Sequence, residues 1–262
     1  MPLSAGQEDL WTRRFHPAPE GTARLVCFPH VGGAATYYFP LSRSLSPAVE
    51  VVAVQYPGRQ DRRHEAVVDN IQDLADRAFA VLREVVEPPF ALFGHSMGAI
   101  VAFEVAGRFE RVAGTPPVRL FVSGRRAPSR HLRGGVHLLT DAGLVAELRH
   151  VGGTDEAFLA DEELRAMLLP VIRADYKAVE TYLWPRQQPL TCPITVLVGD
   201  RDPQTTVDDA AAWTEHSTAG CDLRVFPGGH FYLDAHHDAV VAEITTALAR
   251  QHRTDPLEGA RP

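Results

Sequence analysis

Residues 90–106 read FALFGHSMGAIVAFEVA, and this stretch decides the fold. Its first four residues form an apolar run typical of a buried strand, and the residues from Ala99 onward continue as a helix. Between them, Gly94-His95-Ser96-Met97-Gly98 matches G-x-S-x-G, a pattern that holds a serine on a sharp turn between strand and helix. The sequence therefore predicts that Ser96 is a nucleophile exposed at a sheet edge. The alternative is a serine that only caps the helix N-terminus.

Length and composition indicate a folded chain of one large α/β domain or two small ones. The chain has 262 residues, of which 45% are hydrophobic and 23% charged. Its net charge of −7 argues against binding of nucleic acid. We expect no signal peptide, because Met1–Asp9 has no basic region followed by an apolar one, and no membrane association, because no apolar stretch approaches about 18 residues. Three widely separated cysteines, Cys27, Cys192 and Cys221, argue against disulfides, so we expect a cytoplasmic protein.

Short apolar runs alternate with helical patterns along most of the chain. The runs lack the polar alternation of half-exposed strands, which predicts a mostly parallel sheet with helices on both faces. The strand candidates are Leu25–Phe28, Val51–Val54, Phe90–Phe93, Leu120–Val122, Ile194–Val198 and Leu223–Phe226. Apolar residues at three- and four-residue steps predict helices near residues 71–85 and 240–248. The fold class is therefore α/β.

The alternation stops between residues 128 and 189, a segment with amphipathic helical patterns and no strand candidate. We predict a helical lid insertion over the carboxyl edge of the sheet, where ligands bind in open α/β folds. Two ordinary packing helices are the alternative. Residues 1–127 and 190–250 would then form the core, and 251–262 a flexible tail.

A serine nucleophile needs a base, and His230 is the best candidate among twelve histidines. It follows the last strand candidate in Gly228-Gly229-His230, where paired glycines form a loop that can carry the imidazole back over Ser96. In folds with this serine turn, the acid and the histidine follow the serine in the order Ser, Asp, His, which His230 satisfies. A buried structural histidine is the alternative.

Two carboxylates compete to orient this histidine, because Gly199-Asp200-Arg201-Asp202 ends the preceding strand candidate. Asp202 lies further into the loop, from which a side chain can reach the imidazole. Asp200 still belongs to the strand end and could pair with Arg201 or Arg224. We favour Asp202 and keep Asp200 as the alternative.

The negative charge that develops on the attacked carbonyl oxygen needs two N–H donors that point at one place. The residue after the nucleophile, Met97, supplies one. The loop Phe28-Pro29-His30-Val31-Gly32-Gly33 follows an early strand, and we expect Val31 to supply the other.

Seven short stretches together carry a family resemblance. They read CFPHVGG at 27–33, QYPGR at 55–59, GHSMGA at 94–99, SGRRAP at 123–128, VGGT at 151–154, GDRD at 199–202 and FPGGHF at 226–231. From about Arg24 to Leu248 the chain resembles the type II thioesterases that accompany modular polyketide and nonribosomal peptide synthetases, within the α/β-hydrolase superfamily. His30 stands where a tyrosine or similar residue is expected in relatives.

The resemblance implies an editing enzyme that hydrolyses stalled or wrongly loaded acyl groups from the phosphopantetheine arm of acyl or peptidyl carrier proteins. The residues by themselves indicate only acyl transfer to water through an acyl-serine. An esterase or acyltransferase acting on small acyl esters, and a non-catalytic carrier-binding module, remain alternatives. We expect a monomer that meets its carrier transiently and needs no cofactor and no metal, because the substrate brings the phosphopantetheine.

Carrier proteins are usually acidic, so an acidic chain must dock through a local basic patch. The run from Ser123 to Arg133 contains four arginines and leaves a strand at the catalytic edge. Arg125 and Arg126 are the candidate docking residues, which could meet the pantetheine phosphate or acidic carrier residues. Arginines paired to the lid and to solvent are the alternative.

Overall fold

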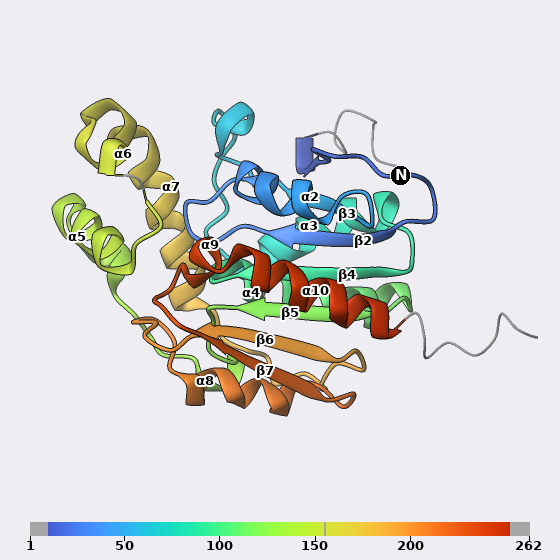
Figure 1. The fold of residues 1–262 in the computed structure, drawn as a ribbon. Coiled ribbons are helices and arrows are strands. Elements are labelled where there is room, and N and C mark those ends of the chain that lie inside the picture. Colours follow the sequence, from blue (N-terminus) through green and yellow to red (C-terminus); the bar gives the residue numbers. More distant parts are fainter. Residues whose placement is uncertain (1–9, 155, 252–262) are drawn as a thin grey trace, which may run out of the picture.

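A seven-stranded sheet lies at the centre of the computed structural model, which describes residues 10–154 and 156–251 (Figure 1). The strand order is β1-β3-β2-β4-β5-β6-β7, and every pairing is parallel except that of β1 with β3. The strands are β1 (Thr12–Arg13), β2 (Ala23–Phe28), β3 (Val49–Val54), β4 (Phe90–His95), β5 (Arg119–Ser123), β6 (Ile194–Gly199) and β7 (Cys221–Phe226). The predicted α/β class is confirmed.

Helices cover both faces of the sheet. The α-helices of the described residues are α2 (Phe39–Leu45), α3 (Ile71–Val85), α4 (Met97–Arg108), α5 (Asp141–Val151), α6 (Glu156–Ala160), α7 (Glu162–Thr181), α8 (Val207–Ala211), α9 (Tyr232–Ala235) and α10 (His237–Gln251). Because side chains alternate along a strand, Val26 and Phe28 pack on the face of α3 and α4, while Leu25 and Cys27 pack on the face of α2 and α10.

All six strand candidates lie within strands, and the two predicted helices correspond to α3 and α10. Helix α3 begins where predicted because the Asn70 side chain accepts the N–H groups of Gln72 and Asp73, at 2.8 and 3.1 Å. No sequence pattern indicates β1, which has two residues and pairs with Val54 and Ala53. β7 is half-exposed because it is an edge strand.

The segment from 128 to 189 is helical, and its helices α5, α6 and α7 lie beyond the carboxyl ends of the strands (Figure 1). Gly152 and Gly153, which connect α5 to the rest of the segment, have φ values of +83° and +78°. The lid role and the domain boundaries stay predictions. Of the predicted tail, Gln251 is the last residue of α10, and 252–262 lie outside the described residues.

The three cysteines are free, with Cys27 and Cys192 buried. No helix in the described part of the chain is both long and apolar enough to cross a membrane.

Candidate active site

Ser96 sits on a strained turn between β4 and α4. Its φ of +54° with a ψ of −117° is a conformation that costs a non-glycine residue about 1–3 kcal/mol. The flanking glycines leave no room for a side chain. A Cβ on Gly94 would lie 2.1 Å from the Gly98 carbonyl oxygen, and a Cβ on Gly98 would lie 2.0 Å from the Phe28 carbonyl oxygen. The turn is held by the Ser96 N–H, which donates to the Ser123 carbonyl at 2.8 Å. The hydroxyl therefore projects from the carboxyl edge of the sheet, as predicted from the motif.

His230 and Asp202 meet in the loops that follow β7 and β6. The His230 Nδ1 lies 2.8 Å from Asp202 Oδ2, and both side chains are buried. The Asp202 Oδ1 also accepts the Gln204 N–H at 2.8 Å, which fixes the carboxylate in its loop. The His230 ring centroid lies 4.9 Å from that of His95, the residue before Ser96, so the imidazole stands beside the serine turn.

Asp200, the alternative acid, points elsewhere. Its Oδ1 accepts the Gly228 N–H at 2.8 Å and lies 3.4 Å from the Arg201 guanidinium. The Gly228 N–H bond is the main reason that the pKa of this exposed carboxyl is lowered. Asp200 thus holds the glycine loop that carries His230, and Asp202 is the carboxylate in contact with the imidazole.

The loop after β2 brings Val31 to the same edge, since β2 and β4 are parallel neighbours. A turn in which the Gly33 N–H donates to the His30 carbonyl at 2.9 Å shapes this loop. Among the described residues, the Val31 N–H has no hydrogen-bond acceptor. Met97 opens α4, where the first amides lack an intrahelical acceptor. The N–H groups of Val31 and Met97, the two predicted oxyanion donors, are therefore both free to donate a hydrogen bond to a substrate oxygen.

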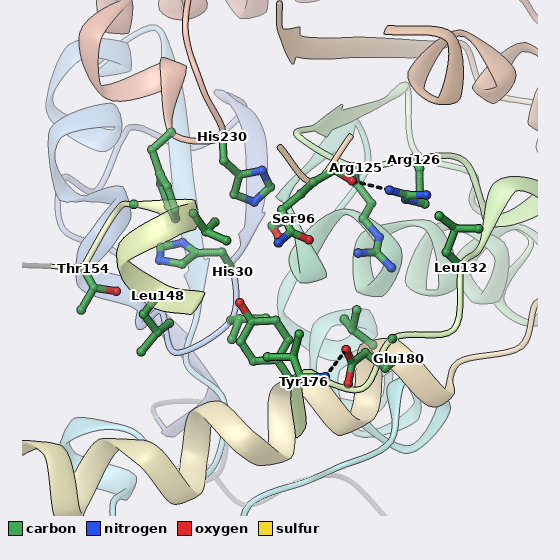
Figure 2. A pocket seen from close by; sticks show the side chains of 18 of the residues that line it. His30, Ser96, Arg125, Arg126, Leu132, Leu148, Thr154, Tyr176, Glu180 and His230 are labelled. Carbon is green, nitrogen blue, oxygen red and sulfur yellow. Dashed lines mark hydrogen bonds between the residues drawn. The ribbon is translucent and has the colours of Figure 1, made fainter. Parts of the chain in front are cut away.

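Ser96 and His230 line one cavity of about 190 Å³. Figure 2 shows the His230 imidazole and the Arg125 guanidinium on either side of Ser96, all facing this space. Val31, Arg126 and Tyr176 of α7 contribute to the wall. A second cavity of about 800 Å³, mostly apolar, lies across the loop after β2, and His30, Val31 and Thr154 line both cavities. No cluster suited to a metal ion occurs among residues 10–154 and 156–251.

Comparison with known proteins identifies the family. The family model of the thioesterase domain matches residues 23–248. The chain belongs to the thioesterase family. The thioesterase PikA5 of Streptomyces venezuelae is 48% identical over 91% of this chain and 85% of that protein. A probable cadicidin biosynthesis thioesterase of Streptomyces griseus is 49% identical over 91% of this chain, which spans 66% of that protein.

Solved structures agree with this assignment. The type II thioesterase BorB from the borrelidin biosynthetic cluster has a TM-score of 0.87 and 51% identity, over 92% of this chain and 98% of that one. The predicted α/β-hydrolase fold is confirmed. The thioesterase is accordingly a serine hydrolase that cleaves thioesters.

Two further histidines pack around the catalytic edge of the thioesterase. His95 is fully buried, with Nδ1 2.9 Å from the Ser123 hydroxyl, and the ring of His30 lies 5.9 Å from that of His95. Burial, followed by the nearby His230, lowers the pKa of His30 to about 3 and that of His95 well below its usual value. Both imidazoles are therefore neutral at pH 7, so neither places a positive charge near His230.

These buried histidines predict a loss of stability in acid. Burial also lowers the pKa of His216, to about 4. In the unfolded chain the same side chains bind protons near pH 6.5. Between about pH 6.5 and 4 the unfolded state therefore holds more protons than the folded one, so stability falls as pH falls. We expect the free energy of unfolding, measured in urea, to drop by at least about 1 kcal/mol per pH unit in this range. A constant value from pH 7 to pH 5 would contradict this.

A buried ion pair ties the thioesterase's oxyanion loop to α7. Asp175 of α7 accepts the Gly32 N–H at 2.8 Å and pairs with Arg59, and both charged side chains are buried. The Arg59 Nε also donates to the Gly33 carbonyl at 3.4 Å. In the sequence, Asp175 is no more than a member of an amphipathic helix. The only signal for its role is an acid three residues after Ile172, within the apolar stripe.

Asp175→Asn is expected to lower kcat by about 10- to 100-fold with little change in KM. The amide still accepts the Gly32 N–H but leaves the Arg59 charge unpaired, so the loop that carries Val31 relaxes. Asp69→Asn is the matched control, because Asp69 pairs with Lys177 on the exposed side of the same helix. Steady-state kinetics of both variants measure kcat and KM, and thermal melting shows whether each variant is still folded. An unchanged kcat in Asp175→Asn would show that the tie does not position the loop.

Proposed function

We propose that the thioesterase is a type II editing enzyme that releases acyl groups from the phosphopantetheine arm of acyl or peptidyl carrier proteins. The observation that carries this proposal is the cavity lined by Ser96 and by the His230 of a buried His230–Asp202 pair, in a chain similar to thioesterases named for cadicidin and borrelidin biosynthesis. Carrier-bound thioesters are the substrates that such clusters offer to a separate thioesterase.

The geometry supports an acyl-serine mechanism. The Ser96 hydroxyl attacks the thioester carbonyl and gives its proton to His230, while Asp202 holds the imidazole through Nδ1 and stabilises its charged form. The Val31 and Met97 N–H groups bind the oxyanion. The C–S bond breaks, and the thiol, with a pKa of about 8–9, leaves with the proton from His230. Water activated by His230 then releases the acid and frees Ser96.

The size of the cavity favours short acyl groups. Its volume of about 190 Å³ is below the roughly 300–1,000 Å³ of sites that enclose drug-sized ligands. His30, Val31 and Thr154 line both this cavity and the larger apolar cavity. We assign a lid role to residues 128–189, whose movement would widen the cavity for a longer acyl chain.

Docking of the carrier involves the mouth of this cavity. Arg126 lines it, although its guanidinium also donates to the Gln204 carbonyl at 2.6 Å and lies 3.6 Å from Asp209. We assign Arg126 to the phosphate of the arriving arm. Arg125, the other predicted docking residue, is directed into the cavity itself. We further propose that the enzyme is a cytoplasmic monomer that holds its carrier transiently.

The test is a hydrolysis panel of acyl-carrier proteins that differ in acyl length. We expect acetyl to butyryl groups to be released at least about tenfold faster than decanoyl groups, because a cavity of about 190 Å³ holds short chains better than long ones. The same acyl groups on N-acetylcysteamine report the chemistry without the carrier. Arg126→Ala is expected to raise KM for the carrier substrate and to leave the small thioester unaffected.

The panel also separates the alternatives. A small-molecule esterase would turn over aryl esters faster than any carrier thioester, and an acyltransferase would divert product to an added alcohol or amine. A non-catalytic carrier-binding module would bind the carrier without reacting with a fluorophosphonate. Each of these results would overturn the proposal.

A further inference from the structure

Arg125 places an unpaired positive charge inside the active-site cavity. It follows β5 and lines the cavity with Ser96. Within the described part of the chain, its guanidinium makes no hydrogen bond or ion pair, and its Nε is shielded from solvent without a partner. The residue is partly exposed and lines the cavity, so the remaining guanidinium N–H groups are open to a ligand that enters it.

Arg126, Arg130 and Glu180 have partners within the fold, whereas Arg133, which also lines the cavity, is a solvent-exposed side chain. Arg126 binds the Gln204 carbonyl, and Arg130 pairs with Glu215 at 2.8 Å on the surface. Glu180, which also lines the cavity, accepts the Val136 and His137 N–H groups at 2.8 and 3.1 Å and contacts the His137 ring.

The charge persists at neutral pH. Burial, with a smaller contribution from Arg126, lowers the pKa of Arg125 to about 10, still well above 7. The cavity therefore holds a cation that is available to a ligand.

The cation lies close to the reacting centre. A Cβ on Gly124, the residue before Arg125, would be 3.3 Å from Cε1 of His230. Figure 2 shows the guanidinium reaching into the space beside Ser96. The phosphate of the arm stays near the carrier surface, at the mouth of the cavity. An anion that reaches Arg125 is therefore carried by the acyl group.

We propose that Arg125 binds the carboxylate of a short carboxyacyl group, so that malonyl-type half-thioesters are substrates of this enzyme. A guanidinium matches a carboxylate with two parallel hydrogen bonds. The inference rests on the proposed function and names its substrate class. Water replaces the thiol at the carbonyl, so the products are the free dicarboxylic acid and the free thiol.

The experiment measures kcat/KM for malonyl, methylmalonyl and butyryl thioesters of N-acetylcysteamine with the full-length enzyme. Arg125→Met is expected to lower the value for the two carboxyacyl substrates by about 30-fold or more. Butyryl hydrolysis should change by less than about threefold, and Arg125→Lys should retain part of the carboxyacyl activity because its charge remains. Arg130→Met, which removes a surface charge from the same segment, should leave all three substrates within about twofold.

Four results would overturn the inference. The first is an equal loss for butyryl and malonyl substrates in both Arg125 variants. The second is a loss of activity in the Arg125 variants that is larger for acyl-phosphopantetheine than for acyl-pantetheine. Arg125 would then bind the phosphate of the arm and not the acyl group. The third is a wild-type enzyme that hydrolyses butyryl but not carboxyacyl thioesters. The fourth, no hydrolysis of any thioester, would refute the proposed function as well, and so is distinguishable from the other three.

Discussion

Ser96→Ala is expected to lower kcat/KM for thioester hydrolysis by at least about 10⁴-fold. The variant removes the attacking oxygen and leaves the oxyanion donors and the His230–Asp202 pair in place. The fold should be unchanged, because the Ser96 side chain makes no hydrogen bond to the described residues and the backbone bond to Ser123 remains. Turnover of an acyl-carrier substrate and labelling by a fluorophosphonate are the two measurements, and both should be lost.

The matched control is Ser44→Ala, which removes an exposed hydroxyl of α2 that lies 2.9 Å from His237. This variant should keep wild-type turnover and labelling. Retention of more than a few per cent of activity in Ser96→Ala, with an unchanged melting temperature, would mean that another group is the nucleophile.

Asp202→Asn is expected to lower kcat by about 10²- to 10⁴-fold. One carboxylate serves two donors, since Oδ1 accepts the Gln204 N–H and Oδ2 lies 2.8 Å from His230 Nδ1. The asparagine amide has only one oxygen. Its NH₂ group would therefore face either the Gln204 N–H, which is also a donor, or His230 Nδ1, where it would favour the tautomer that has no proton on Nδ1. Steady-state kinetics on a small thioester measure this effect without the carrier.

Asp200→Asn provides the comparison, because both residues lie in the same loop and change in the same way. Its amide oxygen can still accept the Gly228 N–H, so we expect a fall in kcat of less than about tenfold. A larger loss in Asp200→Asn than in Asp202→Asn would transfer the orienting role to Asp200. Equal small losses would remove it from both.

Patterns confined to a few neighbouring residues are readable from the sequence alone. The serine turn is such a pattern, since a side chain at Gly94 or Gly98 would clash with the backbone where the strand turns into the helix. The buried strands are equally plain, because an interior parallel strand is apolar on both faces. Ser96, Val31 and His230 each follow the carboxyl end of a predicted parallel strand. Because parallel strands end at the same edge of a sheet, the three residues are expected at one edge.

Contacts between distant segments are not readable in this way. The preference for Asp202 over Asp200 comes from loop length, whereas the contact of Asp202 with the imidazole appears only in the folded loops. Arg59 and Asp175 are 116 residues apart, and neither neighbourhood specifies the other. Arg125 and Arg126 look alike in sequence, yet one guanidinium enters the cavity and the other is bound at its wall.

The primary sequence thus determined the reaction centre and the sheet that carries it, because backbone conformation and burial follow from local residue types. Only the tertiary structure decided which charges neutralise one another and which is left for a ligand. The physical reason is that the strength of an ionic contact depends on separation in space and on exclusion of water, and both are set by packing of segments far apart in the chain.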